Sequence, residues 1–238
     1  MVARLLALYS IFVLSCAPLE SHQVGENAFE QARERMVALQ LKDRDIEDPR
    51  VLKAMGEVPR HEFIPEGMRH YSYSDSPVPI GLDQTISQPY IVALMTQLAR
   101  PKATDRALEI GTGSGYQAAV LSKVVAEVYS IEIVDELARR ASSTLKRLGY
   151  ENVMARQGDG YAGWPEHGPF DLILITAAAP RIPEPLIEQL ADGGRLVLPV
   201  GPPGGYQELI LVEKKKGKVA KKTVIPVRFV PMTGQVQE

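Results

Sequence analysis

A glycine-rich turn is the part of this sequence best suited to bind a ligand. It reads Gly111-Thr112-Gly113-Ser114-Gly115 and follows the short strand-like run 106–110. Glycines let the backbone pass close to a ligand, and a turn from a strand into a helix lies where ligands bind in open α/β sheets. The spacing is G-x-G-x-G and not the G-x-G-x-x-G of dinucleotide enzymes, so a pyrophosphate is not the expected ligand.

Two acidic residues strengthen this interpretation. Glu132 stands near the end of the next strand-like run, where its carboxylate can accept hydrogen bonds from both hydroxyls of a ribose. Asp159 follows the third run, within Gly158-Asp159-Gly160, where it can accept from an adenine amino group. Either acid could instead face solvent or cap a helix. Because three successive strand ends each offer a ligand-type group, we expect a ligand site and not a coincidence.

Periodic patterns predict the elements that position these residues. Strands are expected at 106–110, 127–133, 152–156, 170–177 and 195–200, with helices at 116–125, 135–148 and 185–190. Because strand and helix alternate, the sequence predicts an α/β fold with a doubly wound, mostly parallel sheet. Two further runs, 208–213 and 223–229, flank a lysine-rich turn and predict an antiparallel hairpin at one sheet edge.

Helices are also expected before this core. Asn27 is the predicted N-cap of a first helix, whose inner face would comprise Phe29, Ala32, Met36 and Leu39. Asp48 is the predicted N-cap of a second helix that Gly56 ends, and Gln88-Pro89 begins a third. Residues 57–83 are rich in Pro, Gly, Ser and Tyr without a sustained period, so a structured loop region is expected there.

Composition bounds the function classes. The 238 residues carry 27 Lys+Arg and 29 Asp+Glu, a net charge of −2, and 45% of them are hydrophobic. A globular core is expected, and disorder or a collagen-like repeat is not. The single cysteine cannot form an internal disulfide, and a chain without overall basic charge is not expected to bind nucleic acid. His61, His70 and His167 lack metal-ligand spacing, so we assign no metal.

The first segment has two interpretations. Arg4 precedes the apolar stretch 5–14, which ends at Ser15-Cys16. This is signal-peptide geometry, too short to span a bilayer, and Val13-Leu14-Ser15-Cys16 is similar to the lipobox of bacterial lipoproteins. Alternatively, the translation start has been placed too far upstream, since the folded part is expected to begin near residue 27.

Several motifs together resemble a known family. Residues 108–121, the acid of Ser130-Ile131-Glu132-Ile133, Gly158-Asp159-Gly160 and the run 170–178 are similar to the successive motifs of class I S-adenosylmethionine-dependent methyltransferases. Within that class, Val58-Pro59-Arg60, Pro79-Ile80-Gly81, 84–90 and 227–231 resemble protein-L-isoaspartate O-methyltransferases, over about residues 28–235. The Thr85-Ile86-Ser87-Gln88-Pro89 block is the specific part. Leu82-Asp83 departs from bacterial members, which commonly have Gly followed by another residue there.

The resemblance implies residue roles. Ser87 matches the family's active-site serine, and Thr85 lies beside it in the same loop. From the residues alone, Ser87 could equally be the N-cap of the helix after Pro89. The resemblance implies S-adenosylmethionine as cofactor, isoaspartyl proteins and peptides as substrates, and a cofactor pocket formed by Glu109, Gly111, Thr112, Gly113, Glu132, Asp159 and Gly160.

The implied reaction needs no general base. A sulfonium methyl is a strong electrophile, and an isoaspartyl α-carboxylate is ionised at neutral pH. Alignment of oxygen, methyl carbon and sulfur can then supply most of the catalysis, with Ser87 positioning the carboxylate by a hydrogen bond. The ester would collapse to a succinimide that reopens partly as normal aspartate. Methyl transfer to a small carboxylate or another nucleophile, and a non-enzymatic ligand-binding lipoprotein, stay open as alternatives.

The expected organisation follows from these motifs. Residues 1–26 form a signal-like or misassigned extension, and 27–238 form a single methyltransferase domain. Within it, 27–101 are the N-terminal helical and substrate-loop region, 102–206 the cofactor-binding core and 207–238 the C-terminal strands. We expect a cytoplasmic monomer without a stable membrane span, and the alternative is export or lipid anchoring through Cys16.

Overall fold

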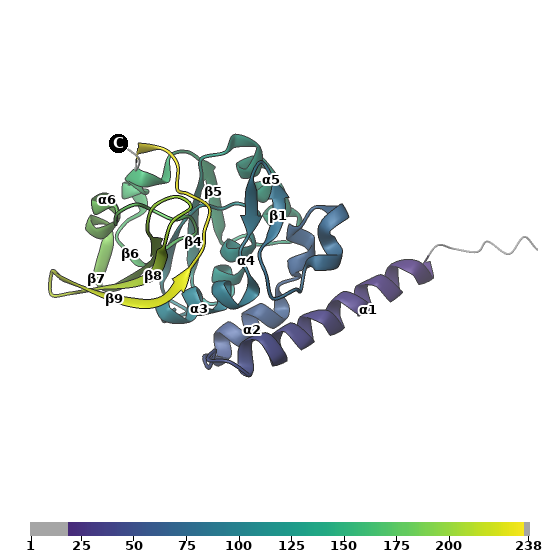
Figure 1. Ribbon diagram of the computed structural model, residues 1–238. Coiled ribbons are helices and arrows are strands. Elements are labelled where there is room, and N and C mark those ends of the chain that lie inside the picture. The colour runs from purple at the N-terminus through teal and green to yellow at the C-terminus, as the bar shows by residue number, and fades with distance from the viewer. Residues whose placement is uncertain (1–18, 236–238) are drawn as a thin grey trace, which may run out of the picture.

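A seven-stranded sheet forms the centre of residues 19–235, the part of the chain that the computed structural model describes (Figure 1). Its order is β5-β4-β3-β6-β7-β8-β9, in which β3 to β7 pair in parallel and β8 and β9 add antiparallel strands at one edge. This confirms the predicted α/β sheet and its hairpin. The strands are β3 (Arg106–Ile110), β4 (Glu127–Glu132), β5 (Val153–Gln157), β6 (Phe170–Ile175), β7 (Leu190–Val200), β8 (Gln207–Lys215) and β9 (Lys218–Val227).

The strand order places the glycine-rich turn at a topological switch point. β4, the next strand of the sheet in the chain, pairs with one edge of β3, and the later strand β6 pairs with the other edge of β3. In open α/β sheets this arrangement leaves a crevice at the carboxyl end of the central strand. The turn at 111–115 follows β3 directly, so the crevice forms above it.

Two different helical layers cover the sheet. Alternate β3 side chains face opposite ways: Ala107 belongs to one core cluster and Leu108 to the other. The first cluster packs under α3 (Pro89–Ala99), α4 (Tyr116–Ser122) and α5 (Asp135–Arg147). The second packs under α6 (Glu184–Glu188) and two short 3₁₀ helices, η4 (Gly160–Ala162) and η5 (Pro165–His167).

The first helix begins earlier than predicted. α1 spans Leu19–Arg35, so Asn27 lies inside it and the predicted N-cap is wrong. Tertiary contacts explain the continuation: Phe29 stacks on the His61 ring with centroids 4.2 Å apart, and Glu26 Oε1 lies 3.5 Å from His61 Nε2. A cap signal is only a local preference, and these contacts on both sides of Asn27 override it.

A π-helix follows α1 and changes which side chains face the core. It spans Met36–Lys42, where the backbone completes each turn with more residues than an α-helix does. Met36 and Leu41 are fully buried, whereas Leu39 is 64% exposed. The predicted inner face is therefore wrong at Leu39, because α-helical spacing does not apply in this segment.

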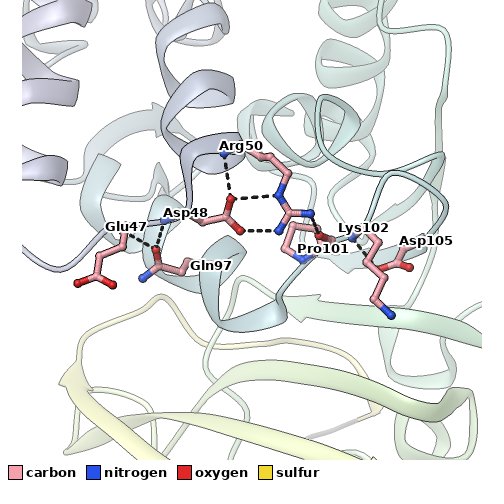
Figure 2. Close-up of polar contacts among 7 residues, drawn as sticks. All are labelled: Glu47, Asp48, Arg50, Gln97, Pro101, Lys102 and Asp105. Atoms are coloured by element: carbon pink, nitrogen blue, oxygen red, sulfur yellow. Dashed lines mark hydrogen bonds and ion pairs between the residues drawn. The ribbon is translucent and has the colours of Figure 1, made fainter.

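The start of α2 (Pro49–Glu57) is tied to the end of α3 (Figure 2). Asp48 Oδ1 accepts a hydrogen bond from Arg50 N at 2.9 Å, which confirms the predicted N-cap. Gln97 Oε1 accepts from the backbone N–H groups of Glu47 and Asp48 at 2.7 and 2.8 Å, and Arg50 donates to the Pro101 carbonyl oxygen. Both helices are thereby held as one unit, next to α1 (Figure 1).

The region predicted as loop contains regular elements. It holds two 3₁₀ helices, η2 (Arg60–Phe63) and η3 (Glu66–Tyr71), and a hairpin of β1 (Val78–Gly81) with β2 (Gln84–Ile86). β1 was not predicted from the sequence because it has only four residues, two of which are the strand breakers proline and glycine. Leu82 and Asp83 form its turn with φ of +53° and +57°, the left-handed backbone that a two-residue type I′ turn requires.

Candidate active site

A pocket lies at the carboxyl ends of β3, β4 and β6, where the switch point predicts a ligand site. No helix of residues 19–235 is both long and apolar enough to cross a membrane. The pocket brings together most of the predicted site residues: Thr85, Ser87, Gly111, Thr112, Gly113, Glu132 and Gly160.

The glycine turn presents bare backbone to this pocket. Gly111 and Gly113 have φ of +96° and +54°. A Cβ on Gly111 would lie 2.5 Å from Thr176 Oγ1, and Gly111 N donates to the Ile131 carbonyl oxygen at 2.8 Å. The turn is therefore pressed onto the sheet, which requires glycine at position 111.

Glu132 holds the other wall of the pocket. Its Oε2 accepts from Gly113 N at 2.7 Å, and its Oε1 accepts from Val134 N at 2.9 Å. The carboxylate is thus fixed in orientation while each oxygen keeps a further lone pair. A bare glycine cradle beside a fixed carboxylate suits the ribose hydroxyls of a nucleoside cofactor.

Glu109 lies beneath the turn and does not line the pocket. Its side chain is 0% exposed and accepts a hydrogen bond from the Ser130 hydroxyl. Ser130 Oγ lies 2.6 Å from Thr112 Oγ1, so a chain of hydrogen bonds connects Glu109 to the turn. Burial raises the pKa of the Glu109 carboxyl to about 8, which keeps it neutral at pH 7. The structure therefore places Glu109 one layer below the other predicted cofactor residues.

Asp159 lies outside the pocket lining, although its neighbour Gly160 lines it. Asp159 Oδ1 accepts from Tyr161 N at 2.9 Å as the cap of η4, and Oδ2 accepts from Gln235 N at 2.8 Å. A Cβ on Gly160 would lie 2.2 Å from Ile110 Cγ2. The Asp159 carboxylate thus joins a tightly packed loop to the end of the chain.

Ser87 stands where this pocket meets a second one. Thr85, Ser87 and Thr176 line both pockets. The N-cap of α3 is Gln88, without a side-chain cap, so the cap interpretation of Ser87 is wrong. Among residues 19–235, the Ser87 hydroxyl has no hydrogen-bond partner, and it is available to a ligand.

Thr176 also belongs to the site, although no sequence pattern singled it out. Its Oγ1 donates to the Gly111 carbonyl oxygen at 2.6 Å, so it supports the turn as well as lining both pockets. Thr176 is the first polar residue after β6, and the strand-end rule that found Glu132 could have found it too. The segment 230–233 also lines the pocket, and its bridge from Pro231 to Ala178 helps to hold it there.

Among residues 19–235, no group of three or more His, Cys, Asp or Glu side chains is placed to hold an ion. The three histidines named above therefore form no such centre with each other or with acids in that range. The polar groups that line the pocket are main-chain groups, the fixed Glu132 carboxylate, hydroxyl groups and the side-chain amides of Gln84 and Gln117.

The fold and this pocket define a class I S-adenosylmethionine-dependent methyltransferase. A model of the family "Protein-L-isoaspartate(D-aspartate) O-methyltransferase (PCMT)" matches residues 31–237. The chain belongs to this family, which confirms the resemblance found in its motifs.

Relatives and solved structures agree. A protein-L-isoaspartate O-methyltransferase of Opitutus terrae is 56% identical over 233 residues, 98% of each chain. One of Synechococcus sp. is 54% identical over 87% of this chain and 88% of the relative. A solved protein-L-isoaspartate O-methyltransferase matches 86% of this chain and 67% of its own with a TM-score of 0.80 and 34% identity. A putative one from Plasmodium falciparum, in complex with S-adenosyl-L-homocysteine, matches 84% of this chain and 98% of its own (TM-score 0.72, 29% identity).

The chain's activity follows from its family. It is an enzyme that uses S-adenosylmethionine to methylate L-isoaspartyl residues of damaged proteins, a step of protein repair. The predicted cofactor, substrate class and enzyme class are confirmed.

Proposed function

We propose that methyl transfer takes place at the junction of the two pockets, with the cofactor in the first and the isoaspartyl peptide in the second. The observation that carries this proposal is the position of Ser87, which lines both pockets with its hydroxyl unpaired within residues 19–235. Thr85 and Thr176 flank the same junction. Methyl transfer between two bound molecules requires that the cofactor site and the peptide site meet at one point.

In this proposal, Ser87 orients the acceptor and does not attack it. Bound S-adenosylmethionine supplies an electrophilic methyl group, and the isoaspartyl α-carboxylate is already ionised at neutral pH. The Ser87 hydroxyl donates a hydrogen bond that aims one carboxylate oxygen, and Thr85 lies beside it. Alignment of this kind supplies roughly 7 to 11 kcal/mol in well-oriented systems.

The second pocket suits an extended peptide. Its lining includes Ile91 and Phe229, which offer apolar surface, and Arg228, whose positive charge complements an acidic residue. Pro226 and Val227 also line it, at the end of β9, which is the outermost strand of the sheet within the described residues. An edge strand leaves backbone groups free to pair with an incoming chain.

On the cofactor side, we propose direct contact for Gly111, Thr112, Gly113, Glu132 and Gly160. Glu109 supports Thr112 from below through Ser130. Asp159 keeps a lone pair on each oxygen beyond those used by Tyr161 and Gln235, so it can still accept from an adenine amino group.

A pair of isomeric peptides tests the proposed function. One peptide contains a single isoaspartate and the other contains aspartate at the same position, and both are incubated with enzyme and methyl-labelled S-adenosylmethionine. We expect label only in the isoaspartyl peptide, because only its α-carboxylate can reach the junction in the required orientation. Equal labelling of both peptides would contradict the proposal, and calorimetry with S-adenosylhomocysteine checks cofactor binding independently.

We also propose that residues 27–238 act as one monomeric domain in the cytoplasm without binding nucleic acid. Residues from one chain line both pockets, the net charge is −2, and the cofactor is made in the cytoplasm. Light scattering checks the monomer, and the intact mass of the native protein locates its N-terminus. A dimer in solution would contradict the first claim, and a lipidated Cys16 would contradict the cytoplasmic location.

A further inference from the structure

A buried arginine lies directly behind Ser87. The Arg60 side chain, at the start of η2, is 0% exposed. Its Nη2 donates to the Ser87 carbonyl oxygen at 2.7 Å, and its Nε donates to the Ser72 carbonyl oxygen at 2.7 Å. Its Cζ lies 4.8 Å from the ring centroid of Tyr116, which lines the cofactor pocket. One side chain thus connects the Ser87 loop with the end of η3 and with α4.

The charge of Arg60 has no carboxylate partner. Among residues 19–235 it forms no ion pair, and its Nη1 is buried without a hydrogen-bond partner. Burial lowers the pKa of Arg60 to about 10, so the guanidinium still carries its charge at neutral pH. Burying an unpaired charge is costly, and hydrogen bonds to two neutral carbonyl oxygens offset that cost only in part. Stability alone therefore gives little reason for an arginine at this position.

The shape of the guanidinium suits the control of geometry. Its donors lie in one plane at fixed angles, so the Ser72 and Ser87 carbonyls are held relative to each other. On the outer side of the loop, Gln88 Nε2 donates to Asp75 Oδ1 at 2.7 Å. Side chains thus tether the loop on both sides of Ser87.

We propose that Arg60 is a positioning residue for methyl transfer, which holds the Ser87 peptide so that the hydroxyl meets the acceptor carboxylate. This inference rests on the proposed role of Ser87. A lysine keeps the charge, but its single ammonium group does not reproduce the planar pair of donors that links the two carbonyls.

The variant Arg60→Lys tests the inference, with Arg33→Lys as the matched control. Arg33 is half-buried and, like Arg60, donates to a carbonyl oxygen, that of Gly56 at 2.8 Å, but within residues 19–235 it forms no hydrogen bond to the Ser87 loop. We expect Arg60→Lys to lower kcat at least tenfold while the Kd of S-adenosylhomocysteine changes less than twofold. Arg33→Lys should leave both within twofold. Arg60→Gln should also lower kcat while leaving the Kd of S-adenosylhomocysteine unchanged, and it replaces Arg60→Lys in the test if the lysine variant does not fold.

A double variant separates positioning from a purely structural role. In a Ser87→Ala background, Arg60→Lys should lower kcat less than twofold, because its effect acts through the missing hydroxyl. An unchanged kcat in Arg60→Lys, an equal loss in Arg33→Lys, or a full tenfold loss in the Ser87→Ala background would overturn the inference.

Hydrogen exchange gives a readout that does not depend on activity. In Arg60→Lys, backbone amides of residues 84–90 should exchange faster than in the wild type, and those of 106–115 should be unchanged. Unchanged exchange at 84–90 would overturn the inference. Full turnover of Ser87→Ala alone would instead refute the proposed role of Ser87, so the two failures are distinguishable.

Discussion

The two sides of the active-site pocket are built on different supports. On the cofactor side, residues of the central strands hold the glycine turn. Gly111 N donates to the Ile131 carbonyl oxygen of the neighbouring strand, and Gly113 N donates to the Glu132 carboxylate at the end of that strand. On the acceptor side, Ser87 lies in a loop between a short hairpin and α3, and the side chain of Arg60 holds its carbonyl. The first support belongs to the sheet, and the second depends on side chains from the N-terminal region.

This difference implies that cofactor affinity and turnover can be altered separately. Backbone hydrogen bonds at the centre of a sheet open only with the core, whereas a loop tethered by side chains can shift while the core stays intact. Substitutions on the cofactor side should therefore change Kd, and those on the acceptor side should change kcat. Four predictions follow this division, from the largest expected effect to the smallest.

Glu132→Ala should have the largest effect and should act on the cofactor. It removes the expected ribose ligand and leaves the N–H groups of Gly113 and Val134 without their acceptor. These groups are half-buried, so each costs less than the roughly 1 to 3 kcal/mol of a fully buried group. We expect the Kd of S-adenosylhomocysteine, measured by calorimetry, to rise about a hundredfold. The exposed control Glu136→Ala should change it less than twofold. A Kd near that of the wild type would show that cofactor binding does not depend on the Glu132 carboxylate.

Ser87→Ala should act on turnover alone. The lost hydrogen bond to an ionised carboxylate is worth about 1.5 to 3 kcal/mol, so we expect kcat to fall roughly 10- to 100-fold. The Kd of S-adenosylhomocysteine should stay within twofold, because within residues 19–235 the glycine turn is held by Ile131, Glu132 and Thr176 and forms no hydrogen bond with the Ser87 hydroxyl. Ser74→Ala, outside both pocket linings, is the matched control. The reverse pattern, weak cofactor binding with normal kcat, would contradict the division of roles between the two sides.

Glu109→Gln should change the pH dependence of stability. The Glu109 pKa rises from 4.5 to about 8 on folding, so the folded chain holds a proton that the unfolded chain releases. This contribution is fully present below pH 4.5 and is lost as the pH rises through 8, with a slope of at most about 1.4 kcal/mol per pH unit. The melting temperature should therefore fall less steeply between pH 5 and 8 for Glu109→Gln than for the wild type. An equal pH dependence of the two melting temperatures would mean that Glu109 is ionised in the folded state.

Leu82→Asn should have the smallest effect, a gain in stability. Leu82 is 46% exposed and has φ of +53°, a backbone conformation that asparagine adopts more readily than leucine. We expect a gain of about 0.5 to 1 kcal/mol in the free energy of unfolding, measured with denaturant. An unchanged kcat would show that the β1–β2 turn can vary without moving Ser87. A loss of stability would indicate that the leucine side chain packs in the folded protein.

Local patterns predicted the cofactor side well. β3 begins and ends at the predicted residues, because a strand buried on both faces must be apolar over a short, bounded run. Glu132 follows from the same reasoning, since it occupies the end of a neighbouring strand. Glu109 is the informative exception. Strand alternation points it away from the face of Leu108 and Ile110, so it lies beneath the turn and outside the pocket lining.

Patterns predicted the acceptor side less well. The family resemblance singled out Ser87 and Thr85, but residues 57–83 have no sustained period from which their structure could be predicted. Their hairpin and two 3₁₀ helices are held by distant partners, as the bond from Arg60 to the Ser87 carbonyl illustrates. Short elements of this kind depend on tertiary contacts more than on local propensity.

The sequence by itself determined the alternation of strands and helices, the glycine turn and the position of Glu132, because these depend on residues close together in the chain. Only the tertiary structure decided that Arg60 lies behind Ser87, that Thr176 supports Gly111, and that Asp159 binds the end of the chain. Each of these contacts joins residues well separated in sequence. They form only when whole elements have packed, and no local period records which distant side chains will then meet.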